Sequence, residues 1–420
     1  MEKINFEVLK GTKDYVGLDA KIKEKLFSTL KEEFMKNGFR PFQTPHIEYI
    51  DTLTNKYNET AEIVQEIFKV TDRGDRNLGL RYDLTIPLCR YLAQNIKSMK
   101  LPFRRFHIGS AFRDGPVKSG RLREFEQCDC DVVGLKGQDV EIELMELFYR
   151  CYKKLGIDVV IELNSNKILK GALKQCNFTE EDLDSLVLSI DKLKKIGIEG
   201  VLKEIKESGF NVDDAKLAIE ILELSDFNVM KEKATHEQLI EGIDELQTLV
   251  EGCQELQIPI RINFSMSRGH AYYTGNIWEV YDVKKRVTSS IGAGGRYDRG
   301  ISDYIGTEEE IPACGISFGV VGIMEILSQE MKDECTGVSD VLVVGLDSSL
   351  TTQCNTIANQ MRESENKNVE LYYGKLKKAF EYCESLGIKE IVVFGKKDEE
   401  NKSFNIKNLE SGEERKIKMK

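Results

Sequence analysis

The sequence predicts an α+β protein with two domains: a large domain whose β-sheet is interrupted by a helical insertion, and a small α/β domain. Strand-like segments lie on both sides of a charged, helical stretch at about 164–256, so one sheet is built from both sides of it. From Ser339 to Lys420, short apolar strands alternate with helices. With 420 residues available, we place the domains at 1–330 and 339–420.

The first expected element is an amphipathic helix. Its apolar residues recur at helical spacing, and Gly38 follows as a stop signal; they are Ile22, Leu26, Leu30 and Phe34. The prolines in the next stretch, "FRPFQTPHIEY", exclude a central strand. We therefore expect that stretch at a sheet edge or a subunit contact.

Two long strands joined by a loop are expected from "LPFRRFHIGSAFRDGPVKSGRLREFEQCDCDVVG". Alternation places Arg113 on the same face of the first strand as Arg105 and His107. The second strand carries a polar row on one face, formed by Arg123, Gln127, Asp129 and Asp131. Such a row either faces solvent or forms the floor of a polar pocket, and the residues by themselves leave both readings open.

Later segments complete the expected order of elements. Thr179 opens the helix "TEEDLDSLVLSIDKLKKIG" with a Thr-x-x-Asp cap. Strand composition returns in "IPIRINFSMSRGHAYYTGNIWEVYD" and "RVTSSIGAGGRYD". The glycine-rich "IGAGGRYD" lacks the spacing of a phosphate loop, so its glycines are expected to allow close backbone approach, leaving Arg296 to hold a partner.

Charge and composition exclude several classes of protein. The net charge of −11 argues against non-specific coating of nucleic acid. Residues 97–123 nevertheless contain eight Lys or Arg against one acid, Asp114, which favours a local anion site. The scattered cysteines and four histidines indicate reduced thiols and no transition-metal site. Without a signal peptide or an apolar span, we expect a cytoplasmic protein with no membrane contact.

Several motifs together resemble the histidyl-tRNA synthetases in order and spacing: "GTKDY", "LRYDLTIPLCRYLA", "FRDGPVKSGRLREFEQCDCDVVG", "RGHAYYTG", "GAGGRYD" and "CGISFGVVGI". The C-terminal "KLKKAFEYCESLGIKEIVVFG" is similar to that family's anticodon-binding domain. The resemblance implies a class II synthetase catalytic domain, with an antiparallel sheet flanked by helices, and a homodimer. Its implied partners are histidine, tRNA(His), and ATP with Mg²⁺ as a substrate, with no tightly bound cofactor.

The resemblance also assigns roles to residues. Arg113 matches the arginine that clamps the α-phosphate and the amino-acid carboxylate, and Arg268 matches one that approaches the α-phosphate during activation. Arg121 and Arg123 match positions for ATP phosphates and the tRNA acceptor end. The remaining matches contact histidine: Asp83, Thr85 and Gln127 near its backbone groups, and Asp131, Tyr272 and Tyr273 around the imidazole. A site built to pair the imidazole nitrogens rejects substrates that leave its polar groups unpaired.

Two motifs depart from the family pattern. His270 and Ala271 stand where Leu and Asp are usual, so His270 is not expected to be a catalytic base. Val321 and Gly322 replace the last polar positions of motif 3, where an arginine contacts the γ-phosphate. Either another cation substitutes, for example Arg299 or Lys118, or ATP activation is weak. Alternatively, "GVVGI" simply extends the apolar packing.

Three functions are therefore in competition. An active histidine–tRNA ligase agrees with the complete hairpin and with the C-terminal domain. A synthetase paralogue acting as a histidine-sensing regulatory subunit of ATP phosphoribosyltransferase agrees with the altered motifs. A protein that binds tRNA or other RNA without catalysis is the third. Histidine-dependent ATP–pyrophosphate exchange, followed by charging of tRNA, separates them.

Overall fold

The fold is described from a computed structural model. It covers the residues 4–55, 62–117, 120–224, 226–267, 272–332 and 337–419. The chain divides into two compact units. The first unit comprises Met1–Asp14 and Glu24–Leu327, and the second comprises Tyr15–Lys23 and Ser328–Lys420.

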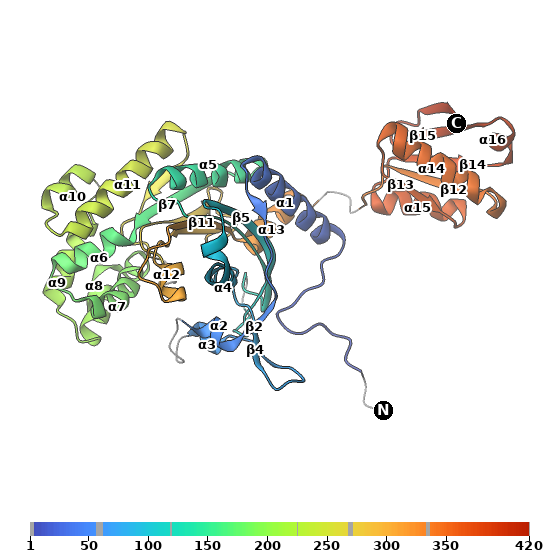
Figure 1. The fold of residues 1–420 in the computed structure, drawn as a ribbon. Helices are drawn as coiled ribbons and strands as arrows, with labels where there is room; N and C mark the ends of the chain where they lie inside the picture. Colours follow the sequence, from blue (N-terminus) through green and yellow to red (C-terminus); the bar gives the residue numbers. More distant parts are fainter. Residues whose placement is uncertain are drawn as a thin grey trace. The chain divides into compact units, whose positions relative to one another are not determined.

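An eight-stranded sheet forms the centre of the first unit (Figure 1). Its strands lie in the order β1 (Arg40–Pro41), β5 (Phe103–Phe112), β6 (Glu124–Val133), β11 (Ala313–Phe318), β10 (Gly292–Arg296), β9 (Asn276–Asp282), β7 (Val159–Ser165) and β8 (Ile260–Ile262). Neighbouring strands are antiparallel except for a parallel pair at each edge, β1 with β5 and β7 with β8. The expected antiparallel sheet is thus a mixed one, and segments from both sides of the helical insertion contribute to it.

The predicted first helix is α1 (Gly17–Lys36). The side chains of Ile22, Leu26, Leu30 and Phe34 are all fully buried. Gly38 follows in the left-handed region at φ +77°, which glycine adopts without steric strain. The edge position expected for the proline-containing stretch is confirmed, because β1 is the outermost strand beside β5.

Helices and a small second sheet flank the large one. The helices are α2 (Ile50–Thr54), α3 (Glu62–Gln65), α4 (Thr85–Asn95), η1 (Ile96–Ser98), α5 (Asp139–Lys154), α12 (Gly300–Ile305) and α13 (Val320–Glu330). The second sheet has the order β2 (Ile47–Tyr49), β4 (Asn77–Leu80) and β3 (Lys69–Thr71). Apolar residues of α4 and α12 join one core cluster with Tyr273 and Tyr297, so this packing fixes the two tyrosines beside the sheet.

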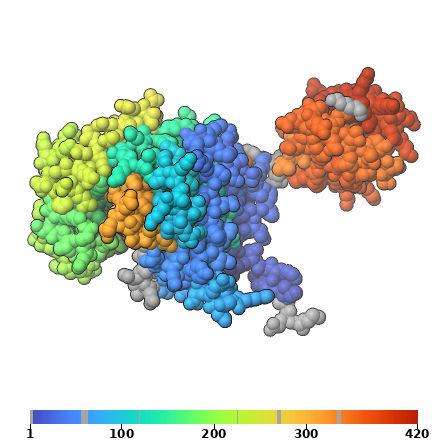
Figure 2. Space-filling view, in the orientation of Figure 1, coloured from blue at the N-terminus to red at the C-terminus, as the bar shows by residue number. Residues whose placement is uncertain are grey.

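The insertion is helical throughout its described part. Its helices are α6 (Asn166–Gln175), α7 (Glu180–Ile190), α8 (Leu193–Glu207), α9 (Val212–Leu222), α10 (Phe227–Lys233) and α11 (Glu237–Glu255). The predicted cap is confirmed, since Thr179 and Asp182 form a capping box at the start of α7. Figure 2 shows these helices, coloured green to yellow, as a lobe at one side of the first unit.

The second unit contains its own five-stranded sheet. The sheet order is β13 (Val369–Tyr372), β12 (Val341–Gly345), β14 (Glu390–Phe394), β15 (Ser403–Asn408) and β16 (Glu414–Lys418). Helical elements complete the unit: η2 (Ser348–Leu350), α14 (Thr351–Glu365), α15 (Leu376–Leu386) and α16 (Lys396–Glu400).

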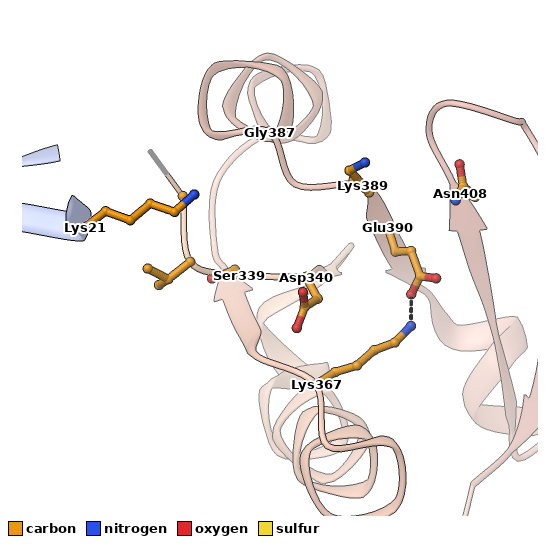
Figure 3. Close-up of a pocket in the computed structure, with 10 residues that line it drawn as sticks. Lys21, Ser339, Asp340, Lys367, Gly387, Lys389, Glu390 and Asn408 are labelled. Carbon is orange, nitrogen blue, oxygen red and sulfur yellow. Dashed lines mark hydrogen bonds and ion pairs between the residues drawn. The ribbon is translucent and has the colours of Figure 1, made fainter. Parts of the chain in front are cut away.

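Both faces of this smaller sheet are covered. Val341 and Val343 of β12 pack with the buried residues of α14, whereas Leu342 and Val344 pack with those of α15. Helices on both faces explain why β12 is apolar at every position and does not alternate. Lys367, just before β13, and Glu390, at the start of β14, form the ion pair drawn in Figure 3. The predicted α/β character of this region is confirmed.

Nowhere in the ranges given above does a helix have the length and apolarity required to cross a membrane.

Candidate active site

A polar pocket on the large sheet brings together all six residues that the sequence suggested for histidine contacts. Residues from β6, β10, β11, the start of α4 and the segment before β9 line it: Asp83, Thr85, Gln127, Asp129, Asp131, Tyr272, Tyr273, Ala293, Gly294, Tyr297, Gly315, Ile316 and Ser317. Of the expected polar row, Gln127, Asp129 and Asp131 therefore lie on the floor of a pocket, whereas Arg123 lies before β6 and does not line it.

Asp83 precedes α4 and presents a carboxylate to the pocket. Its Oδ1 accepts a hydrogen bond from the Ile86 N–H at 3.0 Å. Its Oδ2 is buried and has no hydrogen-bond partner in the described part of the chain. Burial raises the pKa of Asp83 from 3.8 to about 6. A buried carboxylate with a spare oxygen is suited to receive a cationic ligand group.

We expect Asp83→Asn to stabilise the ligand-free protein at pH 8 by about 3 kcal/mol. The folded state raises this carboxyl's pKa above its unfolded value. The contribution of the Asp83 carboxyl to the free energy of unfolding is therefore fully present below about pH 4 and is lost as the pH rises through about 6. Urea unfolding at pH 8 and near pH 4 measures the difference in the free energy of unfolding between the variant and the parent. That difference should nearly vanish near pH 4. An equal difference at both pH values would contradict the assignment of this effect to ionisation.

Asp131 is held by two groups from neighbouring strands. The Tyr297 hydroxyl donates to its Oδ1 at 2.5 Å, and Arg105 Nη2 lies 2.7 Å from its Oδ2. Arg105 is completely buried and sits directly across the β5–β6 ladder from Asp131. Burial raises the pKa of Asp131, whereas Arg105 opposes that rise. The carboxylate is thereby fixed in position within the pocket.

Sequence reasoning assigned no role to Arg105, Asp129 or Tyr297. Arg105 and Asp129 lie in the polar rows already noted on the hairpin, and Tyr297 belongs to "GGRYD". What the sequence did not reveal was the register of β5 and β6, which places Arg105 opposite Asp131 and His107 opposite Asp129. Alternation predicts which face a residue occupies but not which residue stands opposite.

Glycines make room for the pocket floor. A Cβ on Gly315 would lie 2.1 Å from Asp131 Oδ1, and one on Gly294 would lie 2.2 Å from the Gly315 carbonyl oxygen. The expectation of close backbone approach in "GAGGRYD" is therefore confirmed. Arg296 contacts Glu141 and Asp298, both within the protein, and so serves a buried structural network.

Three tyrosine rings form one wall of the pocket. The ring centroids of Tyr272 and Tyr273 are 4.6 Å apart, and that of Tyr297 lies 5.7 Å from Tyr272. The Tyr273 ring packs over Gly295, where a Cβ would approach it to 2.7 Å. The cluster combines apolar ring faces with hydroxyl groups, a surface suited to a small planar ligand group.

Arg113 lies just beyond the end of β5. Its Nε donates to the Tyr82 carbonyl oxygen at 3.1 Å, and its guanidinium lies 5.1 Å from the centroid of the Phe125 ring. The ring contact and the hydrogen bond orient the planar guanidinium. Arg113 is not one of the described residues that line the pocket.

Arg121 and Arg123 lie at the end of the loop between β5 and β6 and are paired with carboxylates. Arg121 forms an ion pair with Glu66, and Arg123 Nη2 lies 3.4 Å from Asp114 Oδ1. Arg123 Nε also donates to the Gly115 carbonyl oxygen at 3.2 Å. Acidic groups brought in by folding therefore offset part of the basic segment that the sequence singled out.

The altered motifs are only partly visible. Lys118, Arg268, His270 and Ala271 lie outside the described residues. Arg299 is paired with Asp303 on α12 at 2.9 Å and also donates to the Glu308 carbonyl oxygen, so it is engaged locally. Val321 and Gly322 begin α13 and are half-buried. A Cβ on Gly322 would lie 3.1 Å from Ile291 Cγ2, which is a tight contact.

Comparisons with known proteins agree over nearly the whole chain. Residues 11–323 match the family described as "Histidyl-tRNA synthetase", and residues 340–420 match "Anticodon binding domain". Histidine–tRNA ligase 1 of Bacillus cereus is 36% identical, with 97% of this chain and 94% of that protein covered. Histidine–tRNA ligase 2 of Shouchella clausii is 34% identical, with 99% of each chain covered.

Solved structures give the same picture. Histidyl-tRNA synthetase from Nostoc sp. PCC 7120 has a TM-score of 0.84 at 25% identity, covering 99% of this chain and 97% of that one. A Bacillus halodurans protein described as an ATP phosphoribosyltransferase regulatory subunit/histidyl-tRNA synthetase has a TM-score of 0.78 at 19% identity, covering 94% and 100%. At that identity the second likeness concerns the fold alone.

Proposed function

The chain belongs to the histidyl-tRNA synthetase family, and we propose which of its residues bind histidine and ATP in the reaction of a histidine–tRNA ligase. The enzyme is a ligase that joins histidine to tRNA. The main observation in support is that six residues from distant parts of the sequence line one polar pocket. That pocket is the histidine site in this proposal.

Recognition of histidine depends on complementary charges at the two ends of the pocket. Asp83, with its unpartnered Oδ2, receives the α-ammonium group, and Thr85 and Gln127 complete this end. At the other end, Asp131 and the tyrosines Tyr272 and Tyr273 surround the imidazole. A substrate without ring nitrogens cannot donate a hydrogen bond to the buried Asp131 carboxylate, and the loss of that charge-assisted bond disfavours its binding.

Activation is a displacement at the α-phosphorus of ATP. An oxygen of the histidine carboxylate forms a bond to that phosphorus while the bond to pyrophosphate breaks, and pyrophosphate leaves with the electron pair. Arg113 neutralises the charge on the carboxylate and the α-phosphate, and its planar fork suits paired oxygens. Arg268, Arg121 and Arg123 contact the phosphates in this proposal, with Mg²⁺ arriving as part of the ATP substrate.

The transfer step requires tRNA(His). The 339–420 domain binds its anticodon region, whereas the 1–330 domain carries the chemistry. A homodimer is also proposed, in which the exposed Ile47 and Tyr49 of β2, with 48% and 54% of their surfaces accessible, lie at the subunit contact. Sedimentation analysis that returns the mass of a single chain, 47.9 kDa, would exclude the dimer.

The regulatory-subunit reading is not favoured over the ligase. The named relatives at 34% to 36% identity are histidine–tRNA ligases, and residues 340–420 match the anticodon binding domain. The likeness that includes a regulatory subunit is one of fold alone.

Histidine-dependent ATP–pyrophosphate exchange and charging of tRNA(His) test the proposal together. A ligase gives both activities. Exchange without charging would place the failure at the tRNA step. Histidine binding without exchange, measured by thermal shift, would instead support a sensing role.

Gly322→Arg should strengthen ATP binding by about tenfold, since it adds a charged contact worth roughly 1.5 kcal/mol where the family places an arginine. The half-buried position leaves the side chain a route outward, although the Cβ must displace Ile291 slightly. ATP affinity measured by calorimetry, together with exchange rates, is compared with that of Gly322→Ala. The comparison separates the effect of the guanidinium from the effect of the added Cβ. Equal affinity of the two variants would contradict a γ-phosphate position there.

A further inference from the structure

Asp129 is a second carboxylate beside Asp131 in the pocket, between Gln127 and Asp131 on β6, and the proposed function does not use it. It lines the pocket two residues before Asp131 on β6 and is only 5% exposed. Ser317 Oγ donates to its Oδ1 at 2.6 Å, and this is the one hydrogen bond it makes in the described part of the chain. Its other oxygen therefore has the capacity to accept from a ligand.

The spacing of the two carboxylates suits a ring placed between them. Residues i and i+2 on one face of a strand are about 6.6–6.8 Å apart. An imidazole ring with a hydrogen bond of about 2.8 Å at each N–H spans a comparable distance. Asp131 lines the same pocket. Tyr297 contacts its Oδ1 and Arg105 its Oδ2, and each carboxylate oxygen can accept a further hydrogen bond from a ligand.

The charges around Asp129 and Asp131 do not balance. The charged and titratable groups nearest to it are Arg105 and His107 of β5, Arg81 and Asp83 before α4, Cys128 and Asp131 of β6, and Tyr297 after β10. The cysteine and tyrosine are neutral at physiological pH, because burial raises the pKa of each.

The remaining charges pair off locally. Burial lowers the pKa of His107 to about 3, so it too is neutral. Arg81 donates to the carbonyl oxygens of Thr44 and Ser110 and has Glu126 and Glu48 as its strongest charged neighbours. Asp83 is assigned to the α-ammonium group. Two carboxylates, Asp129 and Asp131, are thus left with a single guanidinium, that of Arg105.

We propose that this ligase binds histidine with its ring as an imidazolium cation, which donates one N–H to Asp131 and the other to Asp129. The inference rests on the proposed histidine site and adds to it the charge state of the substrate. A positive ring between two buried carboxylates offsets the surplus negative charge. Asp129 thereby becomes a specificity residue, since side chains that cannot carry a proton leave the surplus charge in place.

Binding should then be linked to protons. Burial raises the pKa of Asp129 to about 7, so at pH 8 it is mostly ionised in the ligand-free protein. The ring of free histidine, with a pKa near 6.5, is mostly neutral at pH 8, so binding as imidazolium takes up roughly 0.9 proton. Below about pH 6.5 the Asp129 carboxyl of the ligand-free protein and the ring of free histidine both already carry protons, so binding releases a proton instead.

Isothermal titration of histidine at pH 8, in two buffers with different ionisation enthalpies, measures this uptake directly. We expect close to one proton for the parent protein and none for Asp129→Asn, together with a tenfold to hundredfold weaker histidine affinity in the variant. Glu124→Gln, an exposed carboxyl-to-amide change on the same strand, is the matched control and should retain the parent's uptake. Thermal melts of the ligand-free proteins check that each variant is folded.

The outcomes separate this inference from the proposed function. Histidine binding to the parent without proton uptake at pH 8 would overturn the imidazolium assignment and leave the ligase intact. Uptake that persists in Asp129→Asn would overturn the role of Asp129. No histidine binding to the folded parent would contradict the proposed histidine site itself.

Discussion

Replacing Arg113 by alanine should lower the rate of histidine-dependent ATP–pyrophosphate exchange by about a thousandfold, the larger end of what is lost with one preorganised donor. The side chain is oriented by the Tyr82 carbonyl oxygen and by the Phe125 ring, so its guanidinium is fixed before substrates bind. Alanine removes both the charge and the fork that clamps paired oxygens. Exchange measured at saturating histidine and ATP gives the effect on the chemical step.

Two variants sharpen this experiment. Arg113→Lys keeps the charge without the planar fork and should recover only part of the rate. His270→Leu restores the residue that is usual in the family and should leave exchange unchanged. Full exchange in a folded Arg113→Ala protein would remove the arginine from the proposed mechanism, and an inactive His270→Leu protein would return the histidine as a candidate catalytic group.

Gly315→Ala should weaken histidine binding by about a hundredfold, because the new methyl group would occupy the space that now holds the Asp131 carboxylate and the ring would lose its hydrogen bond to that charged group. The Cβ would lie 2.1 Å from Asp131 Oδ1 and 2.9 Å from its Cγ, so the side chain must move. Moving it breaks the contacts with Tyr297 and Arg105 that hold the carboxylate. Overpacking of a filled site also costs about 1–3 kcal/mol in stability.

Calorimetric titration with histidine and a thermal melt separate the two effects. Gly74→Ala is the matched control, since its Cβ would meet nothing closer than 3.4 Å in an exposed turn. Unchanged histidine affinity in Gly315→Ala would show that Asp131 can relocate without loss, and would argue against its fixed position as the basis of ring recognition.

The sequence alone determined the order of elements and pointed to six of the thirteen described residues that line the pocket. The spacing of Ile22, Leu26, Leu30 and Phe34 was sufficient for α1, because one buried face repeats with the helix period. Alternation identified the polar face of β6. The co-linear motifs then pointed to six residues, which all line the same pocket. These features are local, or are carried by motifs, and are readable without knowing which strands are neighbours.

Only the tertiary structure decided which groups meet. Arg105 lies opposite Asp131 because of the β5–β6 register, and Tyr297 reaches the same carboxylate although it is 166 residues away in the sequence. Folding also placed Glu66 beside Arg121 and left Asp129 facing the pocket with one donor. The physical reason is that register and crossover connections set these distances, and the period of a strand carries no information about either.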